Sequence, residues 1–149
     1  VVVTVTDPNY DGSVNGTLLI EEIDDFTAWQ TDNFTEQQIL DGLADDMKDP
    51  EKDGLYNLAE FALGTDPWEF TPLPAATKDE NGLTLVFTRP EGLGGVSYVA
   101  ETSDGMDTWS PVPLELIDTT GGVETVRARD PLTEGDPAKR FIRLRFTRE

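Results

Sequence analysis

Hydrophobic and polar positions change their period along the chain, from a helical spacing before residue 70 to a strand-like alternation after residue 80. Between residues 55 and 63, apolar side chains recur three or four positions apart and predict a helix. Its apolar positions are Leu55, Leu58, Ala59 and Ala62. Gly64 suits the position just past a helix end, and Pro67 prevents the helix from continuing.

Two shorter helices are expected before this one. Asp24 or Asp25 can cap the first, because a short polar side chain satisfies the free N–H groups at a helix start. Thr35 and Gln38 have the spacing of a capping box, which predicts the start of a second helix that runs to about Leu43.

The second half of the chain alternates apolar and polar residues over short segments that Gly- and Asp-rich turns separate. The expected strands cover residues 83–88, 96–102, 113–117, 123–129 and 141–147. Short strands separated by such turns predict an antiparallel β-sandwich.

Residues 1–6 (VVVTVT) are also strongly β-forming, but they have little partner sequence nearby. The chain is therefore expected to be an α+β protein: a small helical unit, then an antiparallel β-sandwich of about five strands, with an extra N-terminal β segment. The expected boundaries are 1–22 for the N-terminal segment, 23–70 for the helical unit, 71–79 for a Pro-containing linker and 80–149 for the sandwich.

Composition narrows the functional classes. The 149 residues include 30 Asp and Glu against 11 Lys and Arg, a net charge of −19, so the surface repels nucleic acid and anionic membranes and attracts cations. A halophilic or marine surface would have the same composition. The chain has no cysteine and no histidine, which excludes Ser-His-Asp, Cys-His and zinc sites, so we expect no enzymatic activity. No apolar stretch is long enough to insert into a membrane.

The sharpest local motif is residues 49–60, DPEKDGLYNLAE, which has the spacing of a twelve-residue calcium loop. Calcium takes six to eight oxygen ligands, and alternate residues of a tight loop can point several oxygens inward. Gly54 stands where the loop must turn sharply. The expected ligands are Asp49, Glu51, Asp53, the backbone carbonyl of Leu55, Asn57 and, in the first turn of the following helix, Glu60.

One alternative remains open for this loop. It could be an acidic turn that caps the third helix and binds no ion. Glu51 stands where Asp or Asn is usual, and its longer side chain can shift or lose one ligand.

Residues 49–67, DPEKDGLYNLAEFALGTDP, resemble the "DxDGDGLxNLxEYALGTDP" segment of many large secreted bacterial proteins. That segment is similar to a single dockerin-type or thrombospondin-type calcium loop, and a β-rich C-terminal module follows it. The likeness extends over residues 24–149. It implies a non-catalytic, calcium-binding module of a secreted or cell-surface protein, with other domains of a larger parent protein as partners.

Arginines suggest a second, separate site. Arg127 and Arg129 share one face of an expected strand, and Arg143 and Arg145 share one face of another. If the two strands pair, the four side chains form a basic ladder that could bind an anionic polysaccharide, with Trp109 as a sugar-stacking surface. The alternative is that these arginines pair across strands with Glu101, Glu115 or Glu124.

Two functions are consistent with the sequence. The first is an accessory module that anchors, spaces or weakly binds glycans and that calcium stabilises. The second is a structural subunit of an extracellular filament or adhesin, a homo-polymer in which residues 1–22 donate a β-strand to a neighbouring copy. Residues 1–22 could instead be a remnant of a preceding domain.

Overall fold

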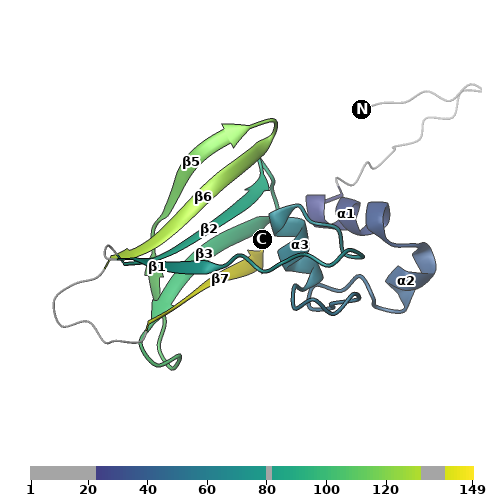
Figure 1. Cartoon of the computed structure of the whole chain (residues 1–149). Coiled ribbons are helices and arrows are strands. Elements are labelled where there is room, and N and C mark those ends of the chain that lie inside the picture. The colour runs from purple at the N-terminus through teal and green to yellow at the C-terminus, as the bar shows by residue number, and fades with distance from the viewer. Residues whose placement is uncertain (1–22, 80–81, 132–139) are drawn as a thin grey trace, which may run out of the picture.

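The structure, a computed structural model, describes residues 23–79, 82–131 and 140–149, and these confirm the α+β fold. Within these ranges, three short helices precede the strands, and the strands form two antiparallel sheets (Figure 1). The helices are α1 (Asp25–Asn33), α2 (Glu36–Leu40) and α3 (Asn57–Leu63). The strands are β1 (Ala76–Asp79), β2 (Gly82–Pro90), β3 (Val96–Ser103), β4 (Ser110–Val112), β5 (Leu114–Thr120), β6 (Val123–Pro131) and β7 (Phe141–Arg148).

The helix starts follow the expected capping chemistry. The Asp24 carboxylate accepts the N–H of Thr27 at 3.0 Å and caps α1. Thr35 and Gln38 form the complete capping box of α2. This helix ends at Leu40, earlier than the sequence suggested, and the chain then turns at Gly42, which has a φ of 73°. A left-handed residue at this point cannot continue the helix.

The five expected strands are present, and two short strands accompany them. β1 occupies the last four residues of the expected linker and forms a hairpin with β2, in which Asp79 lies opposite Gly82. β4 pairs with β3 over three residues. Both segments are too short, and too mixed in character, to show a strand period in the sequence.

The two sheets have the strand orders β1-β2-β6-β5 and β4-β3-β7. They face each other across a core in which Leu85 and Ala128 of the first sheet meet Ala100 of the second. The arrangement is a β-sandwich, and it separates β6 from β7 because each belongs to a different sheet.

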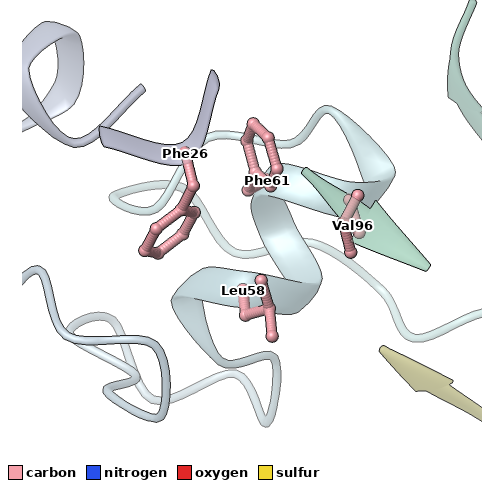
Figure 2. Close-up of a cluster of buried hydrophobic side chains, with 5 residues drawn as sticks. Phe26, Leu58, Phe61 and Val96 are labelled. Atoms are coloured by element: carbon pink, nitrogen blue, oxygen red, sulfur yellow. The ribbon is translucent and has the colours of Figure 1, made fainter. Parts of the chain in front are cut away.

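The helices lie at one end of the sandwich and share its core (Figure 1). Phe26 of α1 packs with Leu58 and Phe61 of α3 and with Val96 of β3 (Figure 2). A second cluster joins α3 to the inner face of β2 and β6 through Phe87 and Val126. The helical unit is thus anchored to the sandwich by α3, all of whose residues are buried.

Two further expectations concern other parts of the chain. Residues 1–22, which were expected to form an N-terminal β segment and to donate a strand to a neighbouring copy, lie outside the described residues. None of the helices in the described ranges is long and apolar enough to cross a membrane.

Candidate metal centre

The loop before α3 brings three predicted ligands together. Asp49, Glu51 and Asp53 each place a carboxylate oxygen within 4.8 Å of the others, and all three side chains are half-buried. Like charges at such distances repel one another unless a cation or a proton lies between them. The cluster could therefore hold a metal ion.

Hydrogen bonds fix the shape of this loop. The two carboxylate oxygens of Asp49 accept the N–H groups of Asp53 at 3.2 Å and of Gly54 at 3.0 Å. Gly54 has a φ of 98°, which confirms the sharp turn that the motif predicts there. Lys52 adopts a φ of 63°, a left-handed conformation that a non-glycine residue rarely takes. The loop is thus held in one conformation by its own acidic side chains.

Asp53 also ties the loop to the sandwich. Its Oδ1 accepts the N–H of Leu55 at 2.7 Å, and its Oδ2 accepts the N–H of Thr71 at 2.7 Å. Thr71 lies in the segment that leads into β1, which is an edge strand of the larger sheet. The sequence gives no sign of the Thr71 contact, since backbone N–H groups are present at every position except proline.

Glu60 of α3, the predicted ligand at the end of the loop, is not one of the three carboxylates that lie within 4.8 Å of one another, and it has no exposed surface. Its Oε1 accepts the hydroxyl of Thr65 at 3.3 Å, whereas its Oε2 is buried without a hydrogen-bond partner. Burial, and after it the charges of Glu51, Asp53 and Asp49, raises the pKa of Glu60 to about 8. An ionised carboxylate is therefore costly here unless a cation neutralises it.

The Glu51 side chain also has a raised pKa and carboxylate oxygens without hydrogen-bond partners. Both of its carboxylate oxygens are buried and have no hydrogen-bond partner. Burial raises the pKa of Glu51, and the neighbouring charges of Asp53 and Asp49 add to the effect. Buried polar atoms without partners are uncommon in folded proteins, and a bound cation could satisfy these three oxygens of Glu51 and Glu60.

Asn57 and Leu55 were predicted as the remaining ligands. Asn57 is fully buried, and its Nδ2 donates to the carbonyls of Leu43 at 2.8 Å and Asp45 at 2.9 Å, so its amide holds the preceding turn. Its Oδ1 has no hydrogen-bond partner. The Leu55 side chain belongs to the core, and the role of its carbonyl as a ligand stays a prediction.

The predicted arginine ladder does not form. β6 pairs with β2 and β5, whereas β7 pairs with β3, so Arg127 and Arg129 lie on a different sheet from Arg143 and Arg145. Cross-strand pairing, the alternative interpretation, holds for three of the four. Arg127 pairs with Glu115 at 2.6 Å, Arg143 pairs with Glu101 at 2.9 Å and Arg145 approaches Glu101 at 3.5 Å.

Trp109 is also engaged within the protein. The guanidinium of Arg143 lies 3.9 Å from the centroid of its ring, and its Nε1–H donates to the carbonyl of Met106 at 3.1 Å. One face of the ring is therefore covered. Arg129 is exposed on β6.

No family model matches the chain, and no curated protein or solved structure matches it either. The resemblance to the loop segment of secreted bacterial proteins accordingly stays a prediction. The interpretation of the acidic loop rests on its own geometry.

Proposed function

We propose that this chain is a non-catalytic, calcium-stabilised accessory module of a secreted or cell-surface protein. The observation that carries the proposal is the group of buried carboxylate oxygens without partners on Glu51 and Glu60, beside the clustered carboxylates of Asp49 and Asp53. A cation bound among the carboxylates of Asp49, Glu51 and Asp53, with the charge of Glu60 nearby, would neutralise these groups.

Calcium fits this donor set better than the other common metal ions. The available side-chain donors are carboxylate and amide oxygens, which hard cations prefer, and the chain has no cysteine or histidine for zinc or copper. Magnesium usually retains several waters and binds through one or two carboxylates, whereas calcium accepts many protein oxygens in an irregular arrangement. Four carboxylates on one twelve-residue loop favour calcium.

The ion would act as a structural clamp. Glu60 lies on α3, which fills the end of the sandwich core, and Asp53 holds the segment before β1 through the N–H of Thr71. A cation bound to both carboxylates would join the helix to the start of the larger sheet. Such a clamp suits a module that spaces or anchors the domains of a larger protein. Glycan binding has less support, because three of the four candidate arginines pair with glutamates.

Amide hydrogen exchange with and without calcium tests the clamp. Calcium should slow exchange both in the loop and at the amide of Thr71, since the two are joined through Asp53. Asp53→Asn should abolish the calcium effect at both places, whereas Asp107→Asn, at an exposed position between β3 and β4, should preserve it. Protection that appears in the loop and leaves Thr71 unaffected would count against a clamp.

A further inference from the structure

The turn after α3 brings Thr65 back onto Glu60, five positions earlier in the chain. The backbone N–H of Thr65 donates to the carbonyl of Glu60 at 3.0 Å. Gly64, between α3 and Thr65, has a φ of 72°, the left-handed conformation that closes many helix ends in this way. Glycine adopts this conformation without strain, so the local sequence of the turn fixes the place of Thr65 beside Glu60.

A second hydrogen bond joins the side chains of the same two residues. The Thr65 hydroxyl donates to Oε1 of Glu60 at 3.3 Å. Thr65 is half-buried, and Glu60 has no exposed surface. A hydrogen bond to an ionised carboxylate contributes more than one between neutral groups, and it also restricts the direction in which the carboxylate points.

The two carboxylate oxygens of Glu60 therefore differ in their surroundings. Oε1 is occupied by the Thr65 hydroxyl, whereas Oε2 is buried and has no hydrogen-bond partner. Glu60 lies outside the group of three loop carboxylates within 4.8 Å of one another, although the charges of those carboxylates reach it. The rotation of the Glu60 side chain thus decides whether Oε2 can contribute to an ion held by that group.

We propose that Thr65 is a positioning residue of the metal centre: its hydroxyl holds Oε1 of Glu60 and leaves Oε2 as the oxygen that Glu60 offers to the ion. This role rests on the proposed calcium site and adds to it a residue outside the twelve-residue loop. A residue that hydrogen-bonds to a metal ligand orients that ligand before the ion binds, and replacing such a residue weakens metal binding by about 10- to 100-fold.

A purely structural role for Thr65 would have a different signature. Both of its hydrogen bonds to Glu60 also close the end of α3, and such a contact stabilises the protein whether or not an ion is bound. Loss of a purely structural contact would therefore lower the stability of the metal-free and metal-bound protein equally and would leave the calcium affinity unchanged. Loss of a positioning contact lowers the calcium affinity itself.

Thr71 provides a matched control. Thr65 and Thr71 both line a cavity of about 270 Å³ beside β2. The backbone N–H of Thr71 donates to Asp53, whereas its hydroxyl donates to the carbonyl of Glu69 at 3.4 Å. Exchange of threonine for valine keeps the branched shape and the backbone N–H and removes the hydroxyl. The same exchange should therefore weaken calcium binding at position 65 and preserve it at position 71.

Calorimetric titration of the full chain with calcium, together with urea denaturation in chelator, tests this role. Thr65→Val should raise the calcium dissociation constant by about tenfold, and Thr65→Ala, which also lacks the hydroxyl, should raise it similarly. Thr65→Ser keeps the hydroxyl and should bind calcium as the native protein does, as should Thr71→Val. Urea denaturation in chelator measures separately how each substitution changes the stability of the metal-free protein.

The possible failures are distinguishable from one another. Native calcium affinity in both Thr65→Val and Thr65→Ala would overturn the role of Thr65 and leave the calcium site in place. An equal loss of affinity in Thr65→Ser or in Thr71→Val would also overturn it, because the Thr65 hydroxyl would then not be the cause. A native protein that binds no calcium would overturn the proposed function and the role of Thr65 together.

Discussion

Replacing Glu60 with glutamine should change the stability of the protein in opposite directions with and without calcium. Glutamine keeps the size of the side chain and removes its charge. In the metal-free protein, the Glu60 carboxylate has no exposed surface, and one of its oxygens has no partner. The uncharged variant avoids the cost of ionising that group.

The size of the effect follows from the pKa. Burial and the neighbouring carboxylates raise the pKa of Glu60 from its ordinary value of 4.5 to about 8. Because the folded state binds this proton more tightly than the unfolded state, the stabilisation is complete below pH 4.5 and is lost as the pH rises through about 8. At about 1.4 kcal/mol per pH unit, this interval corresponds to at most about 5 kcal/mol of unfolding free energy.

Urea denaturation at several pH values from 5 to 9, with chelator or with excess calcium, measures the change in unfolding free energy that the substitution causes in each state. In chelator, the native protein should lose stability across this range, and Glu60→Gln should lose much less and be the more stable of the two above pH 8. In calcium, the native protein should gain about 2.7 kcal/mol at a hundredfold excess over the dissociation constant, and the variant should gain far less. Glu69→Gln, at an exposed position, is the matched control. A Glu60→Gln protein that is less stable than the native protein in chelator at pH 9 would refute the reasoning.

Three further predictions concern the scaffold. Gly64→Ala should lower the unfolding free energy by at least about 1 kcal/mol, because Gly64 has a φ of 72° and an added Cβ would lie 2.8 Å from the Cγ of Pro90. Thermal unfolding should show this loss of stability, and an unchanged melting temperature would contradict it. Phe26→Ala should cost about 3–5 kcal/mol and increase amide exchange throughout α1, since this ring has no exposed surface in the shared core; exchange confined to the substituted position would argue against a shared core. Glu101→Gln should reduce the sensitivity of the protein to acid. The hydrogen bond from Arg143 lowers the pKa of Glu101 below 4.5, so the stability that the ionised Glu101 contributes to the native protein is lost as the pH falls through the lowered pKa. Equal acid midpoints for the two proteins would be the contrary result.

Local sequence signals predicted the parts of the fold that depend on local chemistry. The capping box of Thr35 and Gln38, the left-handed Gly64 and the turn at Gly54 all depend on residues within a few positions of one another. The clustering of Asp49, Glu51 and Asp53 follows from their spacing in one loop. These features could be predicted from the sequence because the short stretch of chain between the residues limits how far apart they can lie.

Features that depend on which distant segments pack together could not be predicted from the sequence in the same way. The predicted arginine ladder required β6 and β7 to be neighbours, but strand order depends on how the whole sandwich folds, and the strands occupy different sheets. β1 is a strand because β2 pairs with it, although its four residues have no clear alternation. The full burial of Glu60 likewise depends on the packing of α3 against the sandwich, which its place in the motif does not determine.

Calorimetric titration of the chelator-treated protein with calcium tests the central claim most directly. The account predicts one strong site per chain, with binding lost in Glu60→Gln and Asp53→Asn and retained in the exposed control Glu69→Gln. Heat of binding that is absent in the native protein, or that persists unchanged in both loop variants, would contradict the assignment of calcium to this loop.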